Sequence, residues 1–412
     1  MKSNARWIGG GFLLTFFSSF GQTFFISASV AEWQAAFDLS HGGFGRIYMI
    51  ATLASALTLP FLGKIVDVAP ERNVIILTTL VLAAATVAAA FAPNIIILIL
   101  AIYLLRLFGQ GMMTHIALTA TGRWFNAQRG RAVSLVVLGH QGGEFALPIV
   151  FAGVTAAYGI SGNWLVAGAM ILLIALPLGA WAYSVPRTPQ SPTGTAGANG
   201  EETPTGDEGA DDWTREQVLR DPYFWLLLTG VLAPAFIGTT LFFHQDYLTD
   251  LHDWPPHLFS LGLSVMALTT VTFALINGAA IDRYGAVSIL PVLLLPLTAS
   301  TFVAGAFSGE AMMFGFMILL GMSYGLSSTL FGALWPEIYG AKHLGAIRSV
   351  IVSAMVLATA IGPGLTGTLI DRGVALPTQL LFLSVYCLVV SGAMTIVSGR
   401  LKARLKTGRA SS

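Results

Sequence analysis

The chain consists of long apolar stretches separated by short polar segments. One crossing of a bilayer requires about 20 predominantly apolar residues, and twelve stretches approach that length. Six precede a long polar gap and six follow it, at 7–31, 44–66, 74–92, 95–121, 131–158 and 163–185, then 222–247, 258–281, 286–307, 311–335, 345–370 and 376–399. We therefore predict an all-α integral membrane protein with 12 transmembrane helices in two six-helix bundles.

The polar gap divides the chain. From 186 to about 214 the sequence is rich in Pro, Thr, Ser, Gly and acidic residues, a composition that cannot bury enough apolar surface to order itself. We predict an N-terminal six-helix bundle at 1–185 and a cytoplasmic flexible linker with a short interfacial segment at 186–220. A C-terminal six-helix bundle with a basic cytoplasmic tail would then occupy 221–412.

The basic residues predict the orientation. Of 21 Lys and Arg, all but three fall at the N-terminus, in the tail, or at connections on the same side of the predicted bundles. The exceptions are Arg46 and Arg372 on the other side and Arg106 within a span. Because cytoplasmic loops carry an excess of Lys and Arg, we expect both termini in the cytoplasm and a multi-pass protein of the cytoplasmic (inner) membrane.

The composition narrows the function. The chain is 55% hydrophobic and 10% charged, with a mean hydropathy of +0.75 and a formal net charge of +1. A soluble enzyme, a nucleic-acid binder and a disordered scaffold are excluded, because soluble domains carry about 25% charged residues. The chain has no phosphate-binding loop and no histidine box, Ser/His/Asp set or metal-ligand spacing, which disfavours a primary pump or a membrane enzyme. We expect no cofactor and no metal.

An internal repeat relates the two halves. Gly63-Lys-Ile-Val-Asp67, after the second span, recurs as Gly278-Ala-Ala-Ile-Asp282 after the eighth, 215 residues later. The same shift relates two further pairs, Gly130 with Gly345 and Pro148 with Pro363. Duplication of a six-helix unit in parallel orientation places a binding site near the midplane where the halves meet. This architecture predicts a transporter.

Ionisable side chains deep in the membrane are expensive and indicate function. Arg106 lies near the centre of the fourth span, Glu144 at the centre of the fifth, and His140 one turn from Glu144 on the same helix face. One interpretation is a substrate and proton site, with Arg106 as fixed positive charge, Glu144 as counter-ion or titrating group, and His140 as relay. The other is a static ion pair between the two helices.

Other candidates are polar or aromatic residues in apolar spans. Phe20 and Gln22 in the first span could line the cavity or only pack, and Tyr324 in the tenth could complete the pocket. At the outer end of the seventh span, His244, Asp246, Asp250, His252 and Asp253 are predicted to form a solvated loop. Small residues and prolines predict helix flexing or tight packing at Gly139, Gly143, Pro148, Gly362 and Pro363.

The loop motifs resemble those of the major facilitator superfamily over essentially the whole chain. They comprise Gly63, Asp67 and Arg72 after the second span, Gly278, Asp282 and Arg283 after the eighth, and Arg106-Leu-Phe-Gly109-Gln-Gly111 in the fourth. The resemblance implies that the loop acids and their basic neighbours act as gating loops, latching helix ends on the cytoplasmic side. In the first copy, Val68-Ala69-Pro70 replaces the basic residue and glycine that usually follow the acid.

A narrower resemblance is to the bacterial branch related to monocarboxylate and oxalate/formate carriers. It is carried by Asp221-Pro-Tyr-Phe-Trp225 at the start of the seventh span, with Trp124-Phe125 and Arg129-Gly130-Arg131 between the fourth and fifth. Those carriers generally place a basic residue in helix 8. The stretch 258–281 has none, so a substrate carboxylate would be met elsewhere.

These observations predict a secondary active transporter that moves a small solute by alternating access. We expect a proton-coupled symporter for a small, monocarboxylate-like organic acid, acting as a monomer in the bilayer without nucleic acid. The alternatives are an exporter of amphipathic or drug-like compounds and, in a different class, a transport-like membrane sensor.

Overall fold

The computed structural model describes residues 4–63, 65–124, 129–185, 213–255, 257–340 and 344–410, and in these ranges the chain is helical with no strand. Within them, ten helices are long and apolar enough to cross a membrane, or eleven when the bent pair Ala5–Gly21 and Thr23–Phe37 is one span. One of the ten, Ala132–Ala182, contains two predicted spans. The predicted all-α fold of transmembrane helices is thus confirmed.

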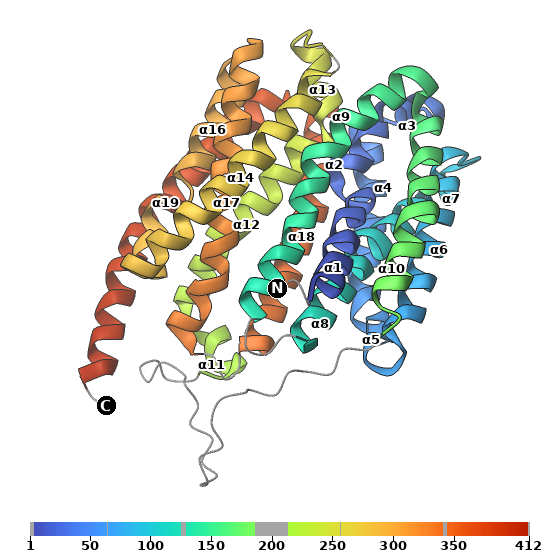
Figure 1. Ribbon diagram of the computed structural model, residues 1–412. Coiled ribbons are helices and arrows are strands. Elements are labelled where there is room, and N and C mark those ends of the chain that lie inside the picture. The colour runs from blue at the N-terminus through green and yellow to red at the C-terminus, as the bar shows by residue number, and fades with distance from the viewer. Residues whose placement is uncertain are drawn as a thin grey trace. The chain divides into compact units, whose positions relative to one another are not determined.

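The double span turns within α9, Arg129–Met170. Gly159 there has a φ of 67° and a ψ of −176°, outside the helical region. A positive φ costs glycine little because it has no Cβ. Figure 1 shows the chain reversing direction within α9 before it continues through α10.

Two compact units make up the chain. The first contains Met1–Ala196, Phe242–Ser264 and Pro363–Asp371, and the second contains Gly197–Leu241, Val265–Gly362 and Arg372–Ser412. Outer segments of the predicted seventh, eighth and eleventh spans therefore belong to the first unit. The predicted domain limits at 185 and 221 stay a prediction, and 186–212 lie outside the described residues.

The first unit begins with a broken helix. This helix comprises α1 (Ala5–Phe17), η2 (Ser18–Gly21), α2 (Thr23–Ile26), η3 (Ser27–Ser29) and α3 (Val30–Phe37). The helices that follow up to α9 are α4 (His41–Leu62), α5 (Ile65–Val68), α6 (Glu71–Ala90), α7 (Ile95–Leu104), η4 (Leu105–Met113) and α8 (Thr114–Trp124). After α9 come η5 (Ile171–Ala175) and α10 (Leu176–Ala182), and later in the chain α13 (Gln245–Leu251). Trp164, Tyr48 and Phe44 are fully buried in its core.

The second unit begins with the short helix α11 (Arg215–Arg220). A capping box stabilises its start, since the Thr214 hydroxyl accepts from the Gln217 N–H and the Gln217 side chain accepts from the Thr214 N–H. The remaining helices are α12 (Pro222–Phe243), α14 (Leu258–Tyr284), α15 (Ala286–Ile289), η6 (Leu290–Val292), α16 (Leu295–Ala306), α17 (Glu310–Tyr339), α18 (Leu344–Asp371) and α19 (Leu376–Ala410). Of these, α12, α14 and α18 also give residues to the first unit.

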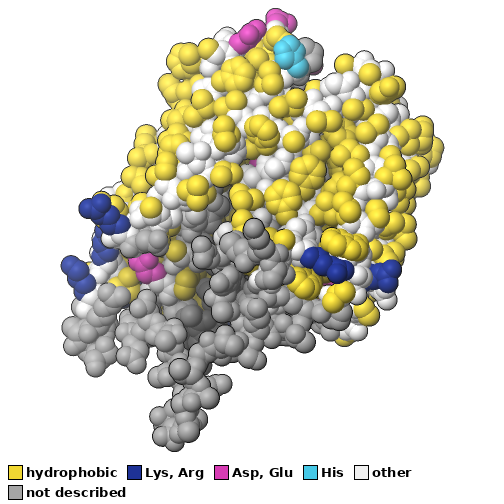
Figure 2. Space-filling model, in the orientation of Figure 1, with side chains coloured by type: hydrophobic (Ala, Val, Ile, Leu, Met, Phe, Trp, Pro, Cys, Tyr) yellow, Lys and Arg dark blue, Asp and Glu magenta, His cyan; other side chains and the backbone are white. Residues whose placement is uncertain are grey.

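Large hydrophobic side chains cover much of the described surface. Phe61, Leu57 and Phe382 are each more than 70% exposed. Figure 2 shows a wide hydrophobic area that contains few charged side chains. Exposed apolar area of this extent marks a surface that contacts lipid rather than water.

Candidate functional site

The first helix breaks at Gly21 and Gln22. Gln22 is extended, with a φ of −84° and a ψ of 156°, so η2 ends at Gly21 and α2 begins at Thr23. The two segments of this span are bent by 43°. Phe25 donates to the Gln22 carbonyl at 3.2 Å, which leaves the Gly21 carbonyl available to another donor.

The fourth span is irregular at the same level. Leu105–Met113 form a π-helix, η4, an element found frequently at functional sites. A Cβ on Gly109 would lie 2.7 Å from the Cα of Gly21, and one on Gly21 would overlap the Leu105 carbonyl oxygen. Glycine at both positions therefore lets the break in the first helix sit directly against η4.

Arg106 fills the space made by these two irregular segments and is 3% exposed. Its Nη1 donates to the Gly21 carbonyl and to the Thr23 hydroxyl, each at 3.3 Å, and its Cζ lies 5.5 Å from the centre of the Tyr48 ring. Thr23 and Tyr48 share a hydrogen bond of 2.7 Å. Arg106 Nε is buried and has no hydrogen-bond partner within the described residues. We call Arg106, Gly21, Thr23 and Tyr48 the Arg106 niche.

Within the described residues, neither Glu144 nor His140 forms a hydrogen bond or an ion pair with the Arg106 guanidinium group. Within the described part of the chain, Arg106 forms no ion pair, and Glu144 has no hydrogen-bond partner although it is 6% exposed. His140 is half-buried one turn from Glu144 on α9. The static ion pair considered from the sequence is therefore not formed, and the positive charge stays without a carboxylate.

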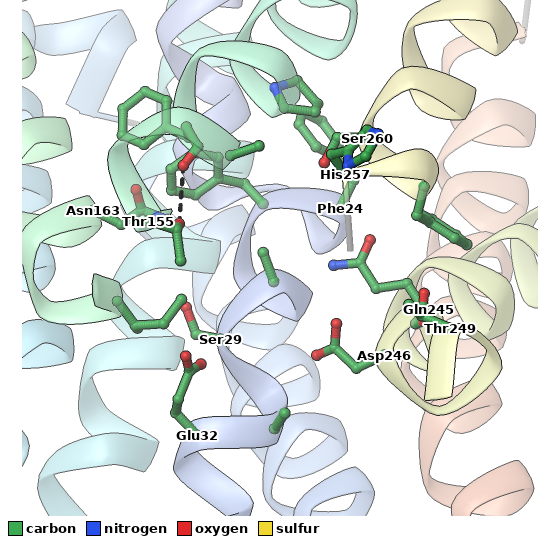
Figure 3. Close-up of a pocket in the computed structure, with 18 of the residues that line it drawn as sticks. Phe24, Ser29, Glu32, Thr155, Asn163, Gln245, Asp246, Thr249, His257 and Ser260 are labelled. Atoms are coloured by element: carbon green, nitrogen blue, oxygen red, sulfur yellow. Dashed lines mark hydrogen bonds between the residues drawn. The ribbon is translucent and has the colours of Figure 1, made fainter. Parts of the chain in front are cut away.

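A cavity of about 610 Å³ lies farther out in the first unit. It is bounded by the outer half of the broken first helix, by α9 beyond Pro148, by α13 and by the start of α14. Glu32 and Asp246 project from opposite walls, as Figure 3 shows. We call this space the outer cavity. His244 is 2% exposed and shares a hydrogen bond of 2.9 Å with Thr366, so the prediction of a solvated loop is wrong for His244 and Asp246.

The other predicted lining residues have packing roles or lack partners. Phe20 is fully buried, with its ring 4.9 Å from Phe25 and 5.6 Å from Phe151. The Gln22 side chain makes no hydrogen bond within the described residues, and its contribution is the extended backbone. In the second unit, the Tyr324 hydroxyl lies against the backbone of Gly238.

The predicted flexible positions are close helix contacts. A Cβ on Gly139 would collide with the Phe12 carbonyl, and one on Gly143 would lie 2.9 Å from the Phe16 carbonyl, so α9 packs tightly on α1. In the second unit, a Cβ on Gly362 would lie 2.9 Å from the Thr240 hydroxyl. Pro148 lines the outer cavity, and Pro363 lies inside α18.

The predicted gating loops are only partly described. The Gly63 carbonyl lies 3.3 Å from His115 Nε2, Arg72 is exposed, and the exposed Arg283 covers the Tyr284 ring. A Cβ on Gly278 would meet open space. The side chains of Asp67 and Asp282 lie outside the described residues. Sequence reasoning missed Glu337, whose carboxylate accepts from the Ala286 and Val287 N–H groups at 2.6 and 3.3 Å and so caps α15.

A second missed feature is the contact between α4 and the end of α18 inside the first unit. Asp371 accepts from the Ser40 hydroxyl at 2.7 Å and from the Gly42 N–H at 3.0 Å. A Cβ on Gly45 would lie 2.5 Å from the Pro363 carbonyl oxygen, and one on Gly367 would lie as close to the His41 carbonyl oxygen. The signal in the sequence was the small-residue spacing of Gly42 and Gly45 opposite Gly364 and Gly367.

The third missed feature is a charged cluster at the start of α12 in the second unit. Asp221, 6% exposed, accepts from Arg404 Nη1 at 2.8 Å and from the Tyr339 hydroxyl at 3.0 Å through Oδ2. Its Oδ1 accepts from the Tyr223 N–H at 3.0 Å. The Arg404 guanidinium also covers the Trp213 ring at 4.7 Å. We call this the Asp221 cluster. Among the described residues, no group of three or more His, Cys, Asp or Glu side chains could hold a metal ion.

Solved structures of similar fold are transporters. A bacterial homologue of the human lysosomal transporter Spinster, in an inward-facing and unoccupied conformation, aligns with a TM-score of 0.68 and 17% identity over 98% of this chain and 96% of its own. The nucleoside transporter NupG aligns with a TM-score of 0.70 and 14% identity over 96% and 99%. At these identities the likeness concerns the fold.

Sequence comparison gives the family. Monocarboxylate transporter 9 of Gallus gallus is 27% identical over 165 residues, which are 39% of this chain and 32% of that protein. The corresponding protein of Mus musculus is 26% identical over 160 residues, so the chain aligns with about a third of these relatives' length. The model of the Major Facilitator Superfamily matches residues 11–252 and 239–410. The chain belongs to the Major Facilitator Superfamily and is a multi-pass membrane transporter.

Proposed function

We propose that the protein is a secondary transporter of the cytoplasmic membrane that moves a small monocarboxylate together with a proton, as a monomer. The observation that carries this proposal is the buried Arg106 guanidinium, which has no carboxylate partner within the described residues. A buried charge is costly unless it is paired. A carboxylate brought in by the substrate would supply the missing pair.

The niche can accept such a group. Arginine presents several N–H donors in a planar fork that matches a carboxylate, and Arg106 Nε has no partner in the structure. The Gly21 carbonyl and the Thr23 hydroxyl hold Nη1, so the fork is already oriented. The eighth span has no basic residue. In this arrangement none is needed there, because Arg106 in the first half of the chain would bind the substrate carboxylate.

Glu144 supports the coupling to a proton. An ionised carboxylate that is buried without a hydrogen-bond partner costs far more free energy than the neutral acid, so Glu144 is suited to take up and release a proton. His140, one turn along α9, is placed to relay it. The gating roles of Asp67 and Asp282, and of the opposed glycines near Pro363, belong to the same proposal.

The names of the aligned relatives support the proposed substrate class. The aligned proteins carry the name monocarboxylate transporter 9. A short carboxylic acid is also compatible with a niche that offers one cation and a few polar groups.

Counterflow in proteoliposomes tests the proposal. We expect acetate, lactate and pyruvate to drive exchange of a labelled monocarboxylate, while their amides do not, because the amides lack the charge that Arg106 would pair. Flux of amphipathic cations instead would overturn the carboxylate assignment, and saturable binding without flux of any solute would favour a sensor.

Coupling to a proton requires a separate experiment, which measures accumulation driven by a pH gradient. Glu144→Gln should abolish accumulation driven by a pH gradient and spare solute exchange, since exchange does not require return of an empty deprotonated carrier. The matched control is Glu310→Gln, because Glu310 is an exposed residue of α17 and its substitution should change neither reaction. Normal accumulation by the Glu144 variant would remove this residue from the coupling.

A further inference from the structure

The outer cavity has a charge opposite to that of the Arg106 niche. Among the described residues, its lining includes the carboxylates of Glu32, Asp246 and Asp250 and a single histidine, His257, with no Lys or Arg. Every lining residue belongs to the first unit. A space lined in this way attracts cations and repels carboxylates.

Two buried polar atoms in the lining have no partner. Asp246 Oδ2 and Asn163 Oδ1 are both buried and accept no hydrogen bond in the structure. Asn163 is 5% exposed and donates through its other amide atom to the Thr155 hydroxyl. Buried polar groups are normally satisfied, so these acceptors indicate a ligand that donates hydrogen bonds or carries positive charge.

Aromatic rings form part of the remaining wall. Phe24, Phe25, Phe151 and Trp164 line the cavity, and Phe25 lies 4.9 Å from Phe151 and 5.3 Å from Trp164, measured between ring centres. Carboxylates beside aromatic rings are the usual surroundings of organic ammonium ligands, because ring faces attract cations. A volume of about 610 Å³ lies within the range of sites that hold small organic molecules.

We infer that the outer cavity is a second ligand site, which binds a small organic ammonium compound through Asp246 and Glu32. Figure 3 shows the two carboxylates on facing walls, with Gln245 beside Asp246. Glu32 is exposed and Asp246 is less so, so a ligand can enter past Glu32 and place its charge against Asp246. This site is separate from the Arg106 niche, and its occupation does not depend on monocarboxylate transport.

Binding at this site should depend on pH. Asp246 lies in α13, beyond the apolar span that ends at Phe243, and burial raises the pKa of Asp246 to about 7. The nearby Glu32 and Asp250 carboxylates add to the rise, against a hydrogen bond from the Ala31 backbone. The charged or titratable groups of the lining are these three carboxylates and His257. Binding should therefore strengthen as the pH rises from about 6 to about 8 and Asp246 ionises.

Choline binding to the full-length protein in lipid nanodiscs tests the inference by calorimetry. We expect saturable binding of choline and none of its uncharged carbon analogue, 3,3-dimethylbutan-1-ol. Asp246→Asn should weaken choline binding at least ten-fold. The matched control is Asp253→Asn, which removes the same charge from an exposed residue at a φ of 52°, a conformation that asparagine tolerates, and it should bind choline normally.

Three outcomes would overturn the inference. These are the absence of saturable choline binding, equal binding of the uncharged analogue, and unchanged binding by folded Asp246→Asn. Arg106→Gln separates this inference from the proposed function, since it should abolish carboxylate exchange and leave choline binding intact. Loss of choline binding in that variant would show that the two sites are one.

Discussion

The Arg106 niche and the Asp221 cluster each contain a buried charge, but only the charge of Asp221 is paired with an opposite charge within the described residues. Arg106 and Asp221 are 3% and 6% exposed. Asp221 has an ion pair, a hydroxyl donor and a backbone N–H, so its charge is neutralised within the second unit. Arg106 has a backbone carbonyl, a hydroxyl and an aromatic ring, which orient it without neutralising it.

This difference supports the proposal that Arg106 binds the substrate and Asp221 stabilises the fold. Burying a charge requires a partner, and the Asp221 cluster shows that this fold can provide one where a charge only holds helices together. Leaving Arg106 without a carboxylate therefore has a cost that structure alone does not explain. The partner is expected to come and go with the substrate.

The largest effect should follow from Gly21→Ala, because the niche depends on backbone contact. A methyl group there would overlap the Leu105 carbonyl and approach Gly109, so the first helix could not sit against η4. We expect little folded protein in the membrane, measured by size-exclusion chromatography of a fluorescent fusion. Gly9→Ala in α1 is the control, since a Cβ at Gly9 meets nothing within 4 Å. Normal yield of the Gly21 variant would mean that the break can shift.

Arg106→Gln should abolish function but not folding. The lost pairing with a substrate carboxylate corresponds to about 1.5–3 kcal/mol, so exchange should fall at least ten-fold in proteoliposomes. No partner carboxylate is stranded, and the yield of folded protein should stay normal. Arg106→Lys should be intermediate, because it keeps the charge without the planar fork. Wild-type exchange by Arg106→Gln would show that Arg106 does not bind the substrate and so would contradict the difference proposed between Arg106 and Asp221.

Asp221→Asn should show the opposite pattern. It removes the negative charge that Arg404 and Tyr339 contact, and since the Arg404 side chain is 29% exposed, solvent would screen part of the loss. We expect a decrease in stability of about 1–2 kcal/mol, seen as a lower Tm in detergent. Exchange per folded molecule should stay within about two-fold of wild type. A selective loss of exchange would place the Asp221 cluster in the transport cycle.

The smallest effects should come from a matched pair of tyrosines. Tyr48→Phe removes the hydroxyl that Thr23 contacts, and Tyr339→Phe removes one that donates to Asp221. We expect a loss of about 0.5–1.5 kcal/mol in each variant, in the free energy of substrate binding for Tyr48→Phe and in the free energy of unfolding for Tyr339→Phe. We expect the Tyr48 variant to raise the KM for the monocarboxylate about two- to ten-fold with little change in Tm, and the Tyr339 variant to do the reverse. If both variants changed KM, or both changed Tm, the distinction between the Arg106 niche and the Asp221 cluster would be contradicted.

The length and spacing of the apolar stretches predict most of the fold. Spans are long and apolar, so their positions could be predicted from the sequence, and even the reversal at Gly159 falls close to the predicted limit between two spans at 158 and 163. The depth of Arg106 and Glu144 in the membrane also follows from counting residues along each span. Their orientation around the helix axis does not, because η4 is a π-helix and the ordinary helical period no longer gives the direction of Arg106.

Features built from backbone or from distant partners were also invisible in the sequence. The freed Gly21 carbonyl depends on an extended Gln22 within an apolar span, and no composition signal marks that break. The Asp221 cluster joins residues 183 positions apart. Asp246 lies in a polar segment that looks like a solvated loop, and only the packing of α13 within the first unit turns it toward the outer cavity.

The long separation within the Asp221 cluster has a consequence for biosynthesis. Asp221 enters the nascent chain 183 residues before Arg404, and at about 5–20 residues per second the ribosome needs about 9–37 s to supply that partner. Until then the carboxylate has the Tyr223 N–H at the start of α12 and, once α17 has been made, the Tyr339 hydroxyl, but no positive charge from Arg404. Translation that stops in α19 before Arg404 would leave the Asp221 carboxylate without its cation, so this ion pair can form only after α19 has been synthesised past Arg404.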